Sequence, residues 1–184
     1  AAARQAAVYG MPAISTSLGT FDHDDYSQAV EATLKVVEAA VEGLPDTPAN
    51  RLRPHGIRGP GQRDGGSSMG VLRMAFQRGD VLLNVNCAGE WDGSYQTTRL
   101  GARWYRGAIE MSSVELDGHS CRIGAKEIVL EEVEGGDADA IAAGSTSITT
   151  LPTWPQTHPL AIPDSLLEAA LEADIHGLPR WLSA

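Results

Sequence analysis

Apolar residues recur at helical spacing within the segment 25–44, at intervals of four, three, four and three residues, and they are Val30, Leu34, Val37, Val41 and Leu44. Such spacing places the side chains on one face of a helix, and we expect this face to pack in the core. Asp25 followed by Gln28 predicts a capping box at the start of the helix, and Gly43 fits its end.

The remaining pattern alternates between helices and short strands. An Ala-rich helix is expected to end at Gly10, with further helices at about 71–77, at 137–143 and from Asp164, where Ser165 and Glu168 form a second capping box and the apolar face reaches Ile175. Apolar or β-branched runs predict strands at 13–17, 80–86, 97–105, 109–116, 120–123, 127–133 and 145–151. A helix, a Gly-Pro break and a short strand are half of a βαβ unit, so the pattern favours an α/β fold with a largely parallel sheet.

The segment 45–70 interrupts this pattern with four prolines and many glycines. Such a composition holds neither a regular helix nor a central strand, and it predicts a long loop or insertion. Its arginines give a locally positive charge, which leaves two alternatives: a loop that binds phosphate or a partner, and a solvated insertion, which the composition favours.

Composition narrows the function classes. The 184 residues carry 14 Lys and Arg against 24 Asp and Glu, a net charge of −10, which disfavours binding to DNA or RNA. No apolar run approaches the roughly 18 residues that a membrane span needs. Two cysteines are too few for a disulfide scaffold and favour a reducing, intracellular compartment, with the cytoplasm first and an organelle as the alternative.

The chain opens inside a helix without Met, so we expect an N-terminal part to be missing.

The familiar catalytic templates are absent from the sequence: it has no Walker loop, no HExxH and no CxxC. His23 lies among Asp22, Asp24 and Asp25, a grouping that suits either a metal site or a polar loop at the entry to a helix. The polar loop is favoured, because neighbouring carboxylates one residue apart point in different directions.

Four segments, taken in order over residues 1–151, resemble the SurE-type survival-protein nucleotidases, which are metal-dependent phosphatases. They are the stretch from Ala2 to Ile14 with Ser17; Leu83-Asn84-Val85-Asn86; Thr98-Arg99-Leu100-Gly101 with Arg103 and Tyr105; and Asp137, Ala140 and Gly144 with Ser147-Ile148-Thr149 and Leu151. The sequence departs from the family pattern at Cys87-Ala88, Ser145 and Thr150, and its insertion at 45–70 is longer than the family's connection.

The resemblance implies a partial SurE-like fold, a three-layer α/β/α Rossmann-like sheet with a projecting β-hairpin arm and a C-terminal helix. Residues 1–184 would be the C-terminal portion of one such domain, with the insertion at about 45–70. The arm and the tail would make homodimer or tetramer contacts. No nucleic acid and no membrane are expected as partners.

The activity implied by the resemblance is hydrolysis of phosphate monoesters such as nucleoside monophosphates, with Mg or Mn held by residues upstream of Ala1. No catalytic residue and no metal ligand is therefore assigned in this chain. Ser17 and His23 are predicted to border the substrate pocket, because open α/β sheets bind ligands beyond the carboxyl ends of their strands. The alternative is a non-catalytic SurE-like remnant that serves as an oligomerisation or interaction module.

Overall fold

The computed structural model describes residues 2–20, 25–44, 66–107, 109–114, 118–123 and 127–183. Its helices are α1 (Ala2–Val8), α2 (Ser27–Glu42), α3 (Ser68–Gln77), α4 (Asp137–Ala142), α5 (Asp164–Ala169) and a 3₁₀ turn, η1 (Arg180–Leu182). Its strands are β1 (Ile14–Leu18), β2 (Val81–Cys87), β3 (Tyr95–Thr98), β4 (Ala102–Arg106), β5 (Ile109–Val114), β6 (Gly118–Ile123), β7 (Glu127–Glu131) and β8 (Thr146–Pro152). Six of the predicted strands are confirmed, as β1, β2 and β5–β8, with ends shifted by two residues or fewer.

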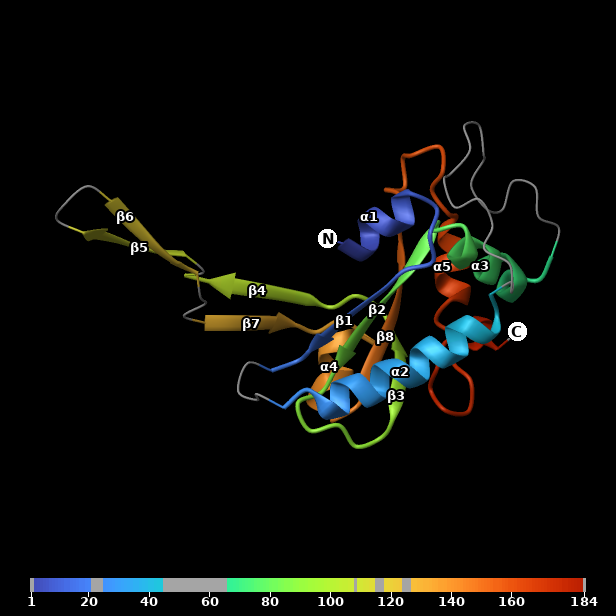
Figure 1. The fold of residues 1–184 in the computed structure, drawn as a ribbon, viewed down its shortest axis with the longest axis horizontal. Coiled ribbons are helices and arrows are strands. Elements are labelled where there is room, and N and C mark those ends of the chain that lie inside the picture. The colour runs from blue at the N-terminus through green and yellow to red at the C-terminus, as the bar shows by residue number, and fades with distance from the viewer. Residues whose placement is uncertain are drawn as a thin grey trace.

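One mixed sheet organises the body, with strand order β1-β2-β8-β3. β1 runs parallel to β2 and β3 runs parallel to β8, whereas β8 is antiparallel to β2. Two of its three pairings are therefore parallel, which agrees with the largely parallel sheet that the sequence pattern predicts. Two antiparallel ribbons, β4–β7 and β5–β6, extend away from the body, and we call residues 102–131 the arm (Figure 1).

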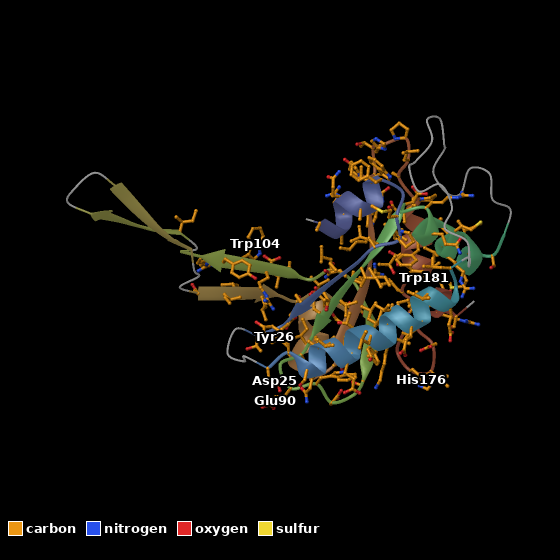
Figure 2. All side chains as sticks on the ribbon, in the orientation of Figure 1. Asp25, Tyr26, Glu90, Trp104, His176 and Trp181 are labelled. Atoms are coloured by element: carbon orange, nitrogen blue, oxygen red, sulfur yellow. The ribbon has the colours of Figure 1, made fainter. Side chains whose placement is uncertain are left out.

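Helices cover both faces of the sheet because alternate side chains of β2 point in opposite directions. Leu83 and its neighbours on one face pack in the main core with α2, α3 and α5. Leu82, on the other face, packs against Ala7 of α1. Trp181 closes the main core, with its ring 5.5 Å from that of Phe76, and it lies in the body whereas Trp104 lies on the arm (Figure 2).

Helix α2 buries a different face from the one that its apolar spacing predicts, although Leu44, the last residue of the predicted stripe, does pack against the main core. The residues buried against the sheet are mostly small, and they are Ala29, Ala32, Val36 and Ala40. Leu34 is 54% exposed, whereas Val36 is fully buried, and Val30 and Val41 are exposed as well. The prediction was wrong because the helix lies on β1 and β2 through alanines, and short side chains permit a close approach that larger ones do not.

The capping box predicted at the start of α2 is also absent. The Asp25 carboxylate accepts a hydrogen bond from the backbone N–H of Ser27, two residues on, at 2.8 Å. The Gln28 side chain accepts instead from the backbone N–H of Trp91 at 3.1 Å, so it ties the helix to the connection after β2. The Gln28 side chain therefore bonds to a distant segment of the chain rather than to the first turn of its own helix, as the sequence pattern predicts.

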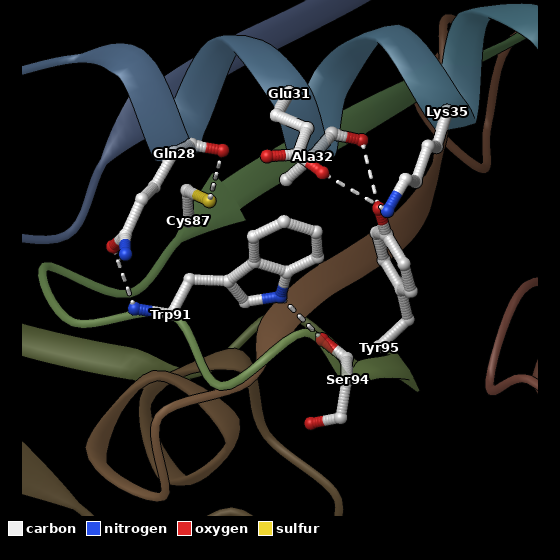
Figure 3. Close-up of polar contacts among 8 residues, drawn as sticks. All are labelled: Gln28, Glu31, Ala32, Lys35, Cys87, Trp91, Ser94 and Tyr95. Carbon is white, nitrogen blue, oxygen red and sulfur yellow. Dashed lines mark hydrogen bonds and ion pairs between the residues drawn. The ribbon is translucent and has the colours of Figure 1, made fainter.

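An aromatic cluster fixes the connection between β2 and β3 to this helix (Figure 3). The Trp91 indole N–H donates to the carbonyl of Ser94 at 2.8 Å, and the Tyr95 ring lies edge-on to Trp91, with centroids 5.4 Å apart. The Tyr95 hydroxyl donates to the carbonyl of Ala32 at 3.2 Å, and Lys35 places its ammonium 5.1 Å from the centroid of the Trp91 ring. Burial raises the pKa of Tyr95 to about 12.

The strand predicted at 97–105 is two strands in different sheets. β3 ends at Thr98, and Arg99 forms an isolated bridge with Gly136. The backbone N–H of Gly101 then donates to the Asp137 carboxylate at 2.9 Å, which turns the chain out of the body into β4. The break therefore depends on a residue 36 positions further along the chain.

The helix that begins at Asp164 ends at Ala169, earlier than predicted, and Ile175 is 94% exposed. Asp174 stops any continuation, since its carboxylate accepts from the backbone N–H groups of His176 and Leu178 at 2.8 and 3.0 Å. The predicted Ser165–Glu168 capping box is absent as well, because Glu168 makes a bidentate ion pair with Arg99.

Helix α3 begins inside the segment predicted as an insertion. Ser67 caps it, with its hydroxyl accepting from the backbone N–H of Gly70 at 3.2 Å. Residues 45–65 of the predicted insertion lie outside the described residues. Among the described helices, none is long and apolar enough to cross a membrane.

Candidate functional site

A chain of polar side chains crosses the carboxyl ends of the parallel strands β1 and β2. Ser17 lies opposite Asn86 in the strand register, and its hydroxyl donates to Asn86 Oδ1 at 2.5 Å. Asn86 Nδ2 donates to Asp137 Oδ2 at 3.1 Å. Two residues earlier on each strand, the Ser15 hydroxyl donates to Asn84 Oδ1 at 2.9 Å. Two successive Ser–Asn hydrogen bonds therefore join the side chains of β1 and β2. Parallel strand ends of this kind are where open α/β sheets bind ligands.

Asp137 sets the orientation of the Asn86 amide. A carboxylate has only acceptors, so the amide presents its NH₂ group to Asp137 and its carbonyl oxygen to Ser17. The second carboxylate oxygen of Asp137 accepts from the backbone N–H of Gly101. Both oxygens are therefore engaged, and the start of α4 is bound both to β2 and to the segment that leads into the arm.

Gly101 is required by the closeness of this contact. A Cβ at this position would lie 2.5 Å from Asp137 Oδ1, well inside van der Waals contact. Any other residue would push the carboxylate away from the backbone N–H that it now accepts. The glycine thus allows the segment before β4 to approach the polar chain.

A cavity of about 370 Å³ opens beside these groups. Its polar lining includes Ser17, Asn86 and Asp137, and its apolar wall includes Leu100 and Ile141. Arg103 and Tyr105, from the first strand of the arm, complete the lining on the side away from the sheet. The volume falls within the range of small-ligand sites, which combine an apolar wall with a few polar groups.

Two charged side chains line the described part of the cavity, the Arg103 guanidinium and the Asp137 carboxylate, and the carboxylate is already engaged by Asn86 and Gly101. Arg99 is paired with Glu168, at 2.9 and 2.7 Å, and Arg106 is paired with Glu127 at 3.5 Å. Arg103, between them in the sequence, makes no ion pair with any residue that the structure describes. Its guanidinium therefore places a positive charge beside the cavity, although the protein as a whole is acidic.

The sequence predicts Ser17 and His23 as pocket-border residues. Ser17 lines the cavity and belongs to its polar chain. His23 lies outside the described residues, and so do Asp22 and Asp24 beside it. Asn86, Arg103 and Asp137 occur in the quoted family motifs but were not predicted as site residues. The signal for Asn86 was an amide at the carboxyl end of a buried strand, whereas nothing local indicates the other two.

The described residues do not fit a complete Mg or Mn site. Within those ranges no three His, Cys, Asp or Glu side chains are grouped to hold a metal ion. Among the described residues of the cavity lining, Asp137 is the one carboxylate, and hydrogen bonds engage both of its oxygens. A hard divalent cation needs several oxygen ligands, so this part of the chain does not bind one alone.

Cys87 is not a candidate nucleophile. Its side chain is buried beneath α2, with the sulfur 3.0 Å from the Thr146 hydroxyl. Burial raises the pKa of the Cys87 thiol, with the hydrogen bond from Thr146 opposing that effect. The thiolate is therefore disfavoured at neutral pH, and the residue acts as a small core side chain.

No protein-family model and no curated protein sequence matches this chain. Solved structures do match, and among them is the crystal structure of the SurE protein from Aquifex aeolicus, with a TM-score of 0.50 and 19% sequence identity. The match covers 84% of this chain and 51% of that one. The chain has a SurE-like fold.

This SurE-like fold confirms the α/β architecture that the four sequence segments indicate. The chain spans about half the length of the SurE chain that it matches. At this identity the likeness shows the fold alone.

Proposed function

We propose that this chain forms part of a metal-dependent phosphomonoesterase that acts on nucleoside monophosphates. The observation that carries the proposal is Arg103, which lines a cavity at the carboxyl ends of two parallel strands and makes no ion pair within the described part of the chain. The SurE-like fold supports it, and each of the four sequence segments that resemble SurE-type nucleotidases contributes at least one residue to the cavity lining, among them Ser17, Asn86 and Asp137.

The residues of this chain supply binding and orientation. The Arg103 guanidinium attracts a phosphate dianion, and its planar donors suit two phosphate oxygens at once. Ser17 and Asn86 hold the edge of the cavity through their hydrogen bond. The Asp137 carboxylate keeps the Asn86 amide in one orientation, which prevents it from turning as a substrate enters. These contacts position a substrate without carrying the chemical step.

The ligands for Mg or Mn are proposed to lie outside this chain, because the described residues do not make up a set. The same holds for the groups that act on the phosphorus atom. This chain alone is then expected to bind a phosphate ester and not to hydrolyse it. The protein extended upstream of Ala1 is expected to do both.

The test measures phosphate released from 5′-AMP in the presence of Mn²⁺, with this chain and with the protein extended upstream. The extended protein should turn over, Arg103→Ala should lower its kcat/KM, and the chain alone should be inactive. Arg106→Ala is the control, since Arg106 lies on the same strand but is paired with Glu127. An extended protein without phosphatase activity would contradict the proposal.

A non-catalytic interaction module is the second candidate. It is favoured by the arm, a ribbon of two strands with exposed apolar side chains at Trp104, Tyr105, Ile128 and Leu130. A two-stranded ribbon is marginal in water unless it packs against something, which also supports a homodimer or tetramer. Sedimentation analysis of the chain and of a Trp104→Ser variant tests this. A monomer for both would remove the argument for assembly through the arm.

A further inference from the structure

Side chains alternate along β4, and this alternation places two of them in the cavity. Arg103 and Tyr105 are two residues apart on the same face of the strand, and both line the cavity. Trp104 lies between them and points to the other face, where its indole N–H donates to Glu131 at 2.8 Å. The arm therefore presents one cation and one aromatic ring to the same space.

The Tyr105 ring meets the requirements for stacking. Its side chain is 49% exposed, so one surface is available to a ligand rather than buried in the protein. Leu100 and Ile141 add aliphatic surface to the same cavity, while the polar chain of Asn86 and Asp137 lies at the strand ends. A nucleoside matches this arrangement of apolar and polar lining residues, because the face of its base is apolar and the hydroxyl groups of its sugar are polar.

The spacing of the two side chains matches that ligand. Residues two apart on a strand have their Cα atoms about 7 Å apart. That distance is similar to the span between the phosphate and the base that a ribose connects. An anion at Arg103 would therefore leave the base beside Tyr105.

We infer that Arg103 and Tyr105 select the substrate of this site, with Arg103 binding the phosphate and Tyr105 stacking on the nucleobase. The inference rests on the proposed function, and it assigns to the arm a role in recognition. Tyr105 distinguishes a nucleotide from a simpler phosphate ester, whereas Arg103 binds both. Neither residue acts on the reacting phosphorus atom.

The test is direct binding by calorimetry to this chain, with 5′-AMP, ribose 5-phosphate and inorganic phosphate as probes. Tyr105→Ala should weaken 5′-AMP binding by roughly 5- to 150-fold, the range that loss of one base–aromatic stack gives, and leave ribose 5-phosphate unchanged. Tyr105→Phe should restore binding, because the ring and not the hydroxyl makes the contact. Arg103→Ala should weaken all three probes alike.

Matched controls lie on the same protein. Arg106→Ala removes a cation from the opposite face of β4, and Tyr9→Ala removes an exposed tyrosine from the end of α1. Neither should change binding of any probe. Thermal unfolding of each variant verifies that the fold is intact, and a variant that fails this check is replaced by Tyr105→Leu or Arg103→Gln.

Two outcomes separate this inference from the proposed function. If the extended protein hydrolyses 5′-AMP with KM unchanged by Tyr105→Ala and Arg103→Ala, the inference is overturned and the phosphatase activity stands. If Tyr105→Ala weakens 5′-AMP and ribose 5-phosphate equally, base stacking is likewise overturned. If the chain shows the expected binding pattern but the extended protein does not release phosphate, the inference stands and the proposed function fails.

Discussion

Asp137 accepts a hydrogen bond from the backbone N–H of Gly101 at 2.9 Å, and a Cβ on Gly101 would lie 2.5 Å from the same carboxylate oxygen. The contact joins the start of α4 to the segment that carries Arg103 into the cavity. Its partner on the other oxygen, the Asn86 amide, belongs to the sheet. The Asp137 carboxylate thus positions both Asn86, at the end of β2, and the segment that leads into β4.

Asp137→Ala should lower the free energy of unfolding by roughly 1–3 kcal/mol, because the Asn86 amide and the Gly101 N–H both lose their acceptor. Urea denaturation measures this. Asp139→Ala is the matched control: it removes an exposed carboxylate from the same first turn of α4 and should change stability by about 0.5 kcal/mol or less. Equal losses for the two variants would contradict the role given to Asp137.

Gly101→Ala should cost roughly 0.5–1.5 kcal/mol, because the Asp137 carboxylate must move and its hydrogen bond with the Gly101 N–H is weakened. The added methyl group collides with Asp137 Oδ1, and the displaced segment should also weaken ligand binding at the cavity. Gly70→Ala serves as the control, since a Cβ there would meet Ser67 Oγ at an ordinary 3.5 Å and alanine favours the helix. Stability unchanged in Gly101→Ala would mean that the contact is looser than the structure shows.

Leu34→Ala should change the free energy of unfolding by about 0.5 kcal/mol or less, because the side chain lies on the exposed face of α2. Val36→Ala, two residues on, should cost roughly 1–3 kcal/mol because Val36 is fully buried. Alanine gains more helix propensity over valine than over leucine, so a larger loss of stability at Val36 must come from its burial. A larger loss of stability for Leu34→Ala than for Val36→Ala would indicate that α2 buries the face that its apolar spacing predicts.

The free energy of unfolding should decrease at alkaline pH, because the partly buried Tyr95 phenol resists losing its proton. Burial is the largest cause of the raised pKa, and the charges of Cys87 and Glu31 add to it. The pKa of Tyr95 is about 12 in the folded protein, against 10 for an ordinary tyrosine, so stability is retained below pH 10 and falls as the pH rises towards 12. The near-ultraviolet absorbance of tyrosinate should show a component titrating near pH 12 that Tyr95→Phe removes.

Local sequence was sufficient where the chain alone specifies an element. The apolar run that becomes β2 is buried from Val81 to Leu83 and again at Val85, and no other structure accommodates it. Ser17 was placed at the cavity from the end of a predicted strand, since strand ends in α/β sheets meet at one edge. The polar partner of Ser17 was not predicted, because nothing in the sequence states that Asn86 lies opposite it in the register.

The cavity depended on contacts between distant segments. Periodicity cannot show that 97–105 breaks in two, since the break arises where Gly101 meets Asp137. The direction of Arg103 follows from that break, because β4 begins only after it. A single uninterrupted strand would have kept this arginine in the sheet and left the cavity without its charge.

Sequence by itself determined the α/β class, most strand boundaries to within two residues and the strand end that carries Ser17, because glycines and apolar runs act over a few positions. Tertiary structure decided which face of α2 is buried. The helix has an apolar stripe through Leu34 and a small-residue face around Ala32, and either is compatible with a helical period. Close packing on β1 and β2 selects the alanine face, since the fit between two surfaces depends on the shape of both, and the sequence of the helix contains only one.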